Sequence, residues 1–329
     1  MNNYCPTVSV VLPAYNAECF LREAIDSILN QTFRDFELIV LNDGSTDRTE
    51  EIILSYDDPR IRYIKNETNL KLIKTLNKGI DLARGEYIAR MDADDICFAN
   101  RLLVEYEYME KHPDIGACSS KVIHLYPNGK TRIGKYYPSR TPIGCKYCSI
   151  FRTPLAHPAS FFRSEVLKRF RYQETESALH IEATVLWGEL ALHDIKMSVI
   201  NERLLYYRDN ENSICHSYTD LMMHNHVERV RYMLKEMLDV KADVDLLNCI
   251  FVNGNFSKYR YKEAAKIFEV ASRLFIRRNN LTCKEIDDIK NINRVIKRGF
   301  YYKWYKETSG FSKVYSLVKL LTNEILIKN

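Results

Sequence analysis

The sequence predicts an α/β protein, with a mixed β-sheet covered by helices on both faces and a helical C-terminal region. Three observations predict it. Short β-branched runs end at turn-forming residues, these runs alternate with segments of helical spacing, and the last third of the chain shows helical spacing alone. With 329 residues, of which 46% are hydrophobic, the chain is long enough to bury a sizeable core.

The first strand, helix and strand are expected close to the N-terminus. Residues 7–12 form a β-branched apolar run that ends at Pro13, and residues 36–41 form a second run that ends in an Asn-Asp-Gly-Ser turn. Between them, apolar residues recur at helical spacing over residues 20–29. This order predicts a βαβ unit with parallel strands.

The same alternation continues along the chain. Helices are expected over residues 47–54 and 70–83, and strands over residues 61–65 and 87–91. The last of these strands runs directly into Asp92-Ala93-Asp94-Asp95. Repeated alternation of this kind is typical of a largely parallel sheet with helices on both faces.

The pattern changes in the second half of the chain. Residues 116–162 contain shorter runs, several prolines and many aromatic residues, which predicts a mixed sheet with loops. Beyond about residue 218, periodic apolar residues predict helices over 221–238, 261–275 and 283–302. We therefore predict a domain of residues 1–217 and a helical region of residues 218–329.

Composition excludes several classes of protein. A formal charge of +5, from 48 basic and 43 acidic residues, is too small a surplus to indicate a nucleic-acid partner. Nine scattered cysteines, with a lone Cys-x-x-Cys at Cys145 and Cys148, resemble neither a disulfide framework nor a zinc site. The sequence shows neither a signal peptide nor the run of about 18 apolar residues that a membrane span requires. We expect a cytoplasmic protein.

Polar residues follow successive strands of the predicted sheet. Asn16, Asp43 and Asp92 each stand where a strand ends. Ligands of such sheets bind beyond the carboxyl ends of the strands. Taken singly, each cluster is also explained as a solvated turn with a helix cap, because Asp and Asn favour both. Their joint position at one edge favours a binding site.

Carboxylates at this edge suit a metal-bridged diphosphate. As the strand turns into a loop, one of Asp92 and Asp94 can face a ribose while the other ligates a divalent metal through oxygen. Mg²⁺ and Mn²⁺ prefer such ligands and keep phosphate oxygens in their coordination shells. A nucleotide-sugar donor needs such a cation because its diphosphate leaves with negative charge.

Four motifs resemble, in order and spacing, those of the family 2 glycosyltransferases with the GT-A fold, a Rossmann-like fold. The resemblance covers about residues 5–215. The motifs are Val8-Ser-Val-Val-Leu-Pro-Ala-Tyr-Asn16, Asn42-Asp-Gly-Ser-Thr-Asp47, Gly85-Glu-Tyr-Ile-Ala-Arg-Met-Asp-Ala-Asp-Asp95 and Leu155-Ala-His-Pro158.

The resemblance implies a donor site. In that family the first-strand loop and the Asp of the Asp-Gly-Ser motif hold the uridine, which assigns Pro13, Ala14, Tyr15, Asn16 and Asp43. Asp92 would contact the ribose, Ala93 would belong to the same nucleotide-sugar site, and Asp94 would ligate Mn²⁺ or Mg²⁺. Three more residues lie in the stretch that usually closes over the base, where Lys71 replaces a common glycine. They are Asn69, Lys74 and Asn77.

The sequence differs from the family pattern at the position where the general base is expected. Members commonly carry Glu-Asp shortly before a Leu-Trp pair, and the Asp takes the proton of the acceptor hydroxyl. In this chain Glu182 matches the Glu and Ala183 stands at the Asp position. Three interpretations stay open: Glu182 has taken over the role, the base is Glu174, Glu176 or His180, or catalysis is weak or absent. We favour a substitute base and assign Glu182.

Two further positions are singled out by the resemblance. A Tyr-Arg-x-His pattern, whose His can join the metal shell, stands here as Tyr207-Arg208-Asp209-Asn210. His157 is either a structural histidine or a contact to acceptor or diphosphate.

The aromatic and basic C-terminal tail, beginning at Phe300, has two interpretations. It is either an interfacial helix on an anionic membrane or a helix packed on the rest of the protein. The family resemblance implies a UDP-sugar donor, a glycan or polyprenyl-linked glycan acceptor, and transfer with inversion. A scaffold that binds nucleotide sugar without turnover is the alternative. A nucleotidyltransferase would need a basic phosphate-activating loop, which Pro13-Ala-Tyr-Asn is not.

Overall fold

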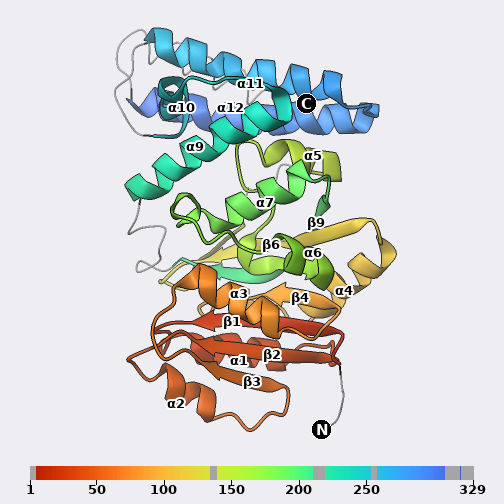
Figure 1. Ribbon diagram of the computed structural model, residues 1–329, viewed down its shortest axis with the longest axis vertical. Coiled ribbons are helices and arrows are strands. Elements are labelled where there is room, and N and C mark those ends of the chain that lie inside the picture. Colours follow the sequence, from red (N-terminus) through yellow and green to blue (C-terminus); the bar gives the residue numbers. More distant parts are fainter. Residues whose placement is uncertain (1–4, 134–138, 210–218, 253–257, 308–318, 320–329) are drawn as a thin grey trace. The chain divides into compact units, whose positions relative to one another are not determined.

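The computed structural model describes residues 5–133, 139–209, 219–252, 258–307 and 319 (Figure 1). These residues form two compact units. The first lies within residues 1–137 and 155–216, and the second within residues 138–154 and 217–329.

The described part of the first unit contains one mixed sheet of nine strands in the order β3-β2-β1-β4-β8-β6-β9-β5, with β7 paired to β6. β1, β2, β3 and β4 are parallel, and β8 is antiparallel to both β4 and β6. The strands are β1 (Val8–Ala14), β2 (Phe36–Asn42), β3 (Ile61–Lys65), β4 (Tyr87–Arg90), β5 (Ile96–Cys97), β6 (Ile115–Leu125), β7 (Thr131–Ile133), β8 (Ser160–Arg163) and β9 (Lys196–Arg208).

Helices cover both faces of this sheet, as predicted. On one face, the apolar side of α1 joins the core formed by alternate residues of β1 and β2. On the other face, α3 approaches β1 so closely that a Cβ on Gly79 would lie 2.5 Å from Val11 Cγ1. The helices of this unit are α1 (Leu21–Leu29), α2 (Thr49–Leu54), α3 (Leu72–Leu82), α4 (Arg101–Lys111), α6 (Ser164–Phe170) and α7 (Glu182–Leu192), with short 3-10 turns η1 (His157–Ala159) and η2 (Glu176–Ala178).

The parallel strands bring the sequence motifs to one edge. β1 and β2 are buried along their whole length, which explains why their residues are mostly apolar and β-branched. Their register pairs Ala14 with Asn42, so both strands end side by side. β4 extends this edge, because Val11 of β1 pairs with Arg90 and accepts a hydrogen bond from Met91 N.

The second unit is helical. Aromatic side chains form much of its interior: Tyr261 and Trp304 stack with ring centroids 5.0 Å apart, and Phe268 lies 5.2 Å from Phe151. Its helices are α5 (Pro142–Cys148), α9 (Thr219–Leu238), α10 (Val244–Phe251), α11 (Lys258–Arg278) and α12 (Cys283–Glu307).

Residues 138–154 belong to this second unit, although they precede residue 217. The buried carboxylate of Asp288 on α12 accepts hydrogen bonds from Arg140 N, Thr141 N and Thr141 Oγ1, at the start of α5. The division into domains at residues 217 and 218 stays a prediction, and the structure adds this earlier segment to the helical unit.

The structure contains the three long helices that the sequence predicts for the C-terminal region. The helices expected over 221–238, 261–275 and 283–302 are present as α9, α11 and α12.

In α12, Phe300 and Trp304 are buried, so this first part of the tail packs within its unit. The remainder of the tail, residues 308–318 and 320–329, lies outside the described residues. Among the helices that are described, none is long and apolar enough to cross a membrane.

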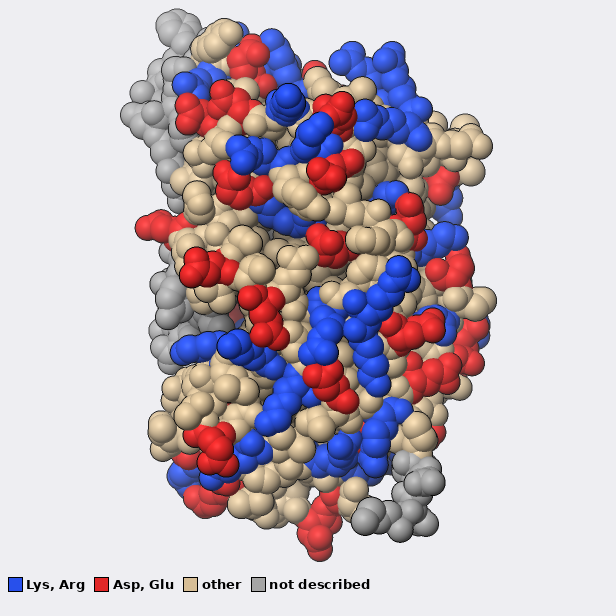
Figure 2. Space-filling view, viewed as in Figure 1, with Lys and Arg blue, Asp and Glu red and all other residues tan. Residues whose placement is uncertain are grey.

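Charged side chains of both signs are spread over the surface. Figure 2 shows Lys and Arg over the visible face with Asp and Glu between them. This mixture agrees with the small net charge of +5.

Candidate active site

Two loops at the carboxyl edge of β1 and β2 are joined by hydrogen bonds. Asn16 adopts φ 47° and its Oδ1 accepts from Thr46 N at 2.9 Å, while Asn16 N donates to Ser45 Oγ at 3.0 Å. Asp43 N donates to Ala14 O at 2.8 Å. Pro13 and Ala14 are buried, whereas Tyr15 is 50% exposed. The loop therefore presents an aromatic ring and a fixed backbone at the edge.

Asp43 holds a third loop against the other two. It is buried, and its Oδ1 accepts from Asn66 Nδ2 at 2.8 Å and from Leu70 N at 2.9 Å. Gly44 adopts φ 71°, and a Cβ there would lie 2.8 Å from Asn69 N. Only glycine permits this close approach. The structure thus brings Asn69 next to the predicted uridine site.

Lys74 and Asn77 differ in their burial and in their contacts. Lys74 is exposed on α3. Asn77 is buried, and its Nδ2 donates to Tyr172 O at 2.9 Å and Glu174 Oε1 at 2.8 Å, while its Oδ1 accepts from Tyr172 N at 3.0 Å. Both ends of this amide therefore bind protein groups. Nucleotide contacts by Lys74 and Asn77 stay predictions.

The backbone at Lys71 is strained, and we expect Lys71→Gly to stabilise the protein. Lys71 has φ 72° and ψ 160° just before α3, in a region that residues other than glycine occupy at a cost of about 1–3 kcal/mol. Glycine loses more entropy on folding, by about 0.5–1 kcal/mol. A rise of a few degrees in the thermal unfolding midpoint is expected. Lys74→Gly, inside the same helix, should instead lower it, and equal effects of both changes would contradict this account.

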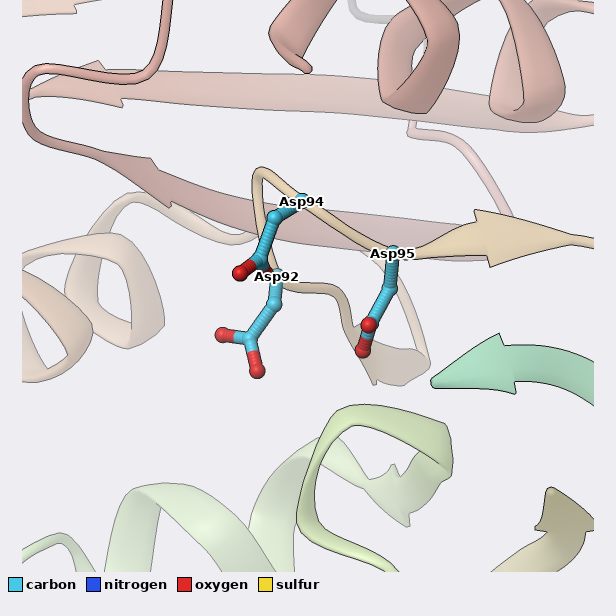
Figure 3. A group of neighbouring side chains, drawn as sticks. All are labelled: Asp92, Asp94 and Asp95. Atoms are coloured by element: carbon cyan, nitrogen blue, oxygen red, sulfur yellow. The ribbon is translucent and has the colours of Figure 1, made fainter. Parts of the chain in front are cut away.

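Three carboxylates gather in the loop after β4 (Figure 3). Oxygens of Asp92, Asp94 and Asp95 lie within 4.8 Å of one another, and all three side chains point to the same side of the loop. Ala93 between them is half-buried and packs against the core. The predicted ribose and metal residues are therefore brought together, with Asp95 as a third carboxylate.

Asp95 is the most buried of the three. Its Oδ1 accepts from Arg208 N at 2.9 Å, and its buried Oδ2 has no hydrogen-bond partner among the residues that the structure describes. Burial raises the pKa of the Asp95 carboxyl well above its ordinary value, and the charges of Asp92 and Asp94 raise it further. An orphaned oxygen beside two like charges fits a divalent cation, which would relieve the repulsion and accept these hard oxygen ligands.

A buried arginine lies beneath this loop. Arg90 Nη1 donates to Asp92 Oδ2 at 2.6 Å, and its side chain is only 5% exposed. Burial alone would lower the pKa of Arg90, but Asp92 and other neighbours more than offset this and raise it. No role was predicted for Arg90 from the sequence. Its place two residues before Asp92, inside a buried strand, was the available signal.

Glu182, His157 and Tyr172 form a second group beside Arg90. His157 Nε2 lies 2.7 Å from Tyr172 Oη, and His157 Nδ1 lies 4.0 Å from Glu182 Oε1. Burial, and then the charge of Arg90, lower the pKa of His157 well below its ordinary value. Burial raises the pKa of Glu182, with a further contribution from Asp92. The histidine is therefore neutral, and Glu182 is a carboxyl group suited to accept a proton.

The alternative bases lie elsewhere in the same segment. Glu174 is exposed and accepts a hydrogen bond from Asn77, and Glu176 is exposed in η2. His180 adopts φ 64° and is half-buried. Ala183 is the second residue of α7 and places no acid–base group there. Asn210 lies outside the described residues.

Comparison with known sequences gives relatives that are described as glycosyltransferases. The family described as Glycosyl transferase family 2 matches residues 9–171. An uncharacterized glycosyltransferase of Methanocaldococcus jannaschii is 38% identical over 208 residues, which cover 62% of this chain and 71% of the relative. The putative glycosyltransferase EpsE of Bacillus subtilis is 32% identical over 215 residues, covering 64% and 76%.

Solved structures share the fold. TarS 1-349 of S. aureus, crystallised with UDP-GlcNAc, superposes with a TM-score of 0.58 at 19% identity, covering 98% of this chain and 90% of that one. The mannosyltransferase PcManGT of Pyrobaculum calidifontis, in complex with GDP-Man and Mn²⁺, gives a TM-score of 0.58 at 15% identity, covering 98% and 88%. At these identities the similarity shows the fold alone.

Proposed function

Because this chain belongs to glycosyl transferase family 2 and has the GT-A fold, we propose that it transfers a sugar, with inversion, from a UDP-sugar to a glycan hydroxyl. That it is a glycosyltransferase follows from the family. The observation that carries the finer proposal is the carboxylate cluster after β4, which lies in the same sheet edge as the loops after β1 and β2. That edge is where a nucleotide is expected to bind.

The donor nucleotide is proposed to lie on the loops joined by Asp43. Tyr15 offers an exposed ring, and the loop held by Asp43 brings Asn69 close to Gly44. Arg90 donates a hydrogen bond to Asp92 and so holds the Asp92 side chain in place for a ribose hydroxyl. This arrangement binds the nucleotide half of the donor independently of the sugar.

Asp94, with Asp92 and Asp95 as neighbours, is proposed to hold Mn²⁺ or Mg²⁺. A bound divalent cation neutralises the charge that develops on the departing diphosphate. The chain's own contribution is to hold three carboxylates on one side of a single loop. PcManGT, with the same fold, was solved with Mn²⁺, which supports this part of the proposal.

Glu182 is proposed as the general base. The acceptor oxygen attacks the anomeric carbon, the bond from that carbon to the diphosphate breaks, and the hydroxyl proton moves to a Glu182 carboxylate oxygen. A single displacement of this kind inverts the anomeric centre. His157 and Tyr172 lie beside Glu182, and Arg90 and Asp92 are the charged groups that act on its carboxyl.

Donor binding and turnover test the proposal. The purified full chain is titrated with UDP and GDP by calorimetry, with Mn²⁺ or with EDTA, and is then assayed for release of UDP from several UDP-sugars. We expect UDP to bind in EDTA and to bind more tightly with Mn²⁺, and we expect UDP release to require the metal. GDP binding without UDP binding would overturn the choice of nucleotide. Equal release in EDTA would overturn the metal role, and tight UDP binding without turnover towards lipid-linked acceptors would overturn the catalytic proposal.

The acceptor and the cellular location stay proposals. A glycan or polyprenyl-linked glycan acceptor, and a cytoplasmic protein in peripheral contact with the membrane, are inferred from the family resemblance and the tail composition. Most of that tail lies outside the described residues. Sedimentation of the full chain with anionic lipid vesicles would test the membrane contact.

A further inference from the structure

The carboxylate loop needs support from outside itself. Within the turn, the hydrogen bond from Asp95 N to Asp92 O is long, at 3.4 Å. Three carboxylates within 4.8 Å of one another repel when they are ionised, which favours opening of the loop. A fixed arrangement therefore requires partners from other elements.

The end of β9 supplies such partners. Ile96 and Cys97, directly after the loop, pair with Tyr206 and Leu205. Arg208, two residues after Tyr206 in β9, contacts the loop twice. Its backbone N donates to Asp95 Oδ1 at 2.9 Å, and its side-chain Nε donates to Asp94 O at 2.7 Å.

Arg208 is itself held in place. Its Nη2 forms an ion pair with Glu23 of α1, and its guanidinium lies 4.5 Å from the centre of the Phe20 ring. Its backbone continues the parallel register with β6, where it pairs with Leu125. The guanidinium thus joins the loop after β4 to α1, and the fork geometry of arginine allows both bonds at once.

We propose that Arg208 is a positioning residue that preforms the Asp92–Asp95 loop for a divalent cation. By fixing the peptide group of Asp94 and one oxygen of Asp95, it directs both carboxylates to the side on which Asp92 lies. The inference rests on the proposed metal role of this loop. Partners that orient ligands without touching the metal commonly govern affinity in this way.

The test is the affinity for Mn²⁺, measured by calorimetry and by electron paramagnetic resonance with UDP present, in the full chain. Arg208→Gln removes the Nε and Nη2 bonds and is expected to weaken Mn²⁺ binding by about 10–100-fold. Arg208→Lys keeps the charge but cannot make both bonds, so an intermediate loss is expected. Arg203→Gln, an exposed arginine on the same strand, should leave the affinity unchanged.

The outcomes separate this inference from the proposed function. If the unmodified protein binds Mn²⁺, Asp94→Ala abolishes binding and Arg208→Gln matches the unmodified protein, only the role of Arg208 is overturned. If the unmodified protein does not bind Mn²⁺, both are overturned. If Arg208→Gln does not fold, the test uses Arg208→Lys and Glu23→Gln instead. An unchanged Mn²⁺ affinity in both variants would overturn the inference. A weakened affinity at an unchanged unfolding midpoint would support it.

Discussion

Replacing Asp94 by Asn is expected to reduce metal-dependent sugar transfer by at least about 10²–10³-fold, since metal stabilisation of a departing diphosphate is worth several kcal/mol and each 1.4 kcal/mol is tenfold. The side chain keeps its size and loses the charge that the cation needs. The loss should appear in kcat/KM and in Mn²⁺ affinity. UDP binding in EDTA should be unchanged, because Asp43 and Tyr15 belong to other loops.

The control for this change is Glu107→Gln, which removes an exposed carboxylate of α4 that is paired with Lys111. Its rate and Mn²⁺ affinity should match those of the unmodified protein. A rate within about threefold of normal for Asp94→Asn, under conditions where Mn²⁺ is required, would show that Asp94 is not a metal ligand.

Replacing Glu182 by Gln is expected to lower kcat by about 10²–10⁴-fold, the range of general-base assistance. Donor affinity should change little, because the contacts proposed for the nucleotide lie on other loops. Single-turnover rates with a UDP-sugar and acceptor measure the effect. Glu189→Gln, on the same helix, is the matched control and should retain the normal rate.

The pH dependence gives a second measurement of the same residue. Burial raises the pKa of Glu182, so its carboxylate becomes protonated at a higher pH than an ordinary glutamate. A base must be deprotonated to act, and the rate should therefore fall as the pH drops through this raised pKa. Glu182→Gln should remove that acidic limb.

Position 183 distinguishes the remaining interpretations. If Glu182 is the base, Ala183→Asp should change the rate little, since a proton acceptor is already present. A large gain in rate from Ala183→Asp, together with a normal rate in Glu182→Gln, would show that this chain lacks its base. It would also show that Ala183 marks the missing position.

Much of the first half of the fold could be predicted from the sequence. The runs in β1 and β2 are mostly apolar, and the spacing in α1 and α3 places apolar residues towards the sheet. These signals are local, because the spacing of apolar residues that indicates each helix or strand lies within that element's own stretch of sequence. The later strands were harder to predict, since β6 is buried or half-buried throughout although it contains polar residues, and β9 mixes buried and exposed positions without strict alternation.

Part of the candidate site could also be predicted, because strand ends and motifs are visible along the chain. Asp43 and the carboxylates follow β2 and β4, and both of these strands pair in parallel with β1, which brings their ends to one edge. Arg90 lies inside the Gly85–Asp95 motif, but no role was assigned to it from the sequence. The partner of Asn77 could not be predicted, since Tyr172 lies 95 positions away.

The sequence by itself determined the α/β class, the edge of the sheet that carries polar residues, and the departure from the family at Ala183. Only the tertiary structure decided which groups meet there. Arg208 contacts Asp95 from 113 positions away, and His157 meets Tyr172 and Glu182 around Arg90. Residues 138–154 likewise join the helical unit through Asp288. Such contacts depend on burial and on hydrogen bonds between distant segments, and these leave no period in the sequence from which they could be predicted.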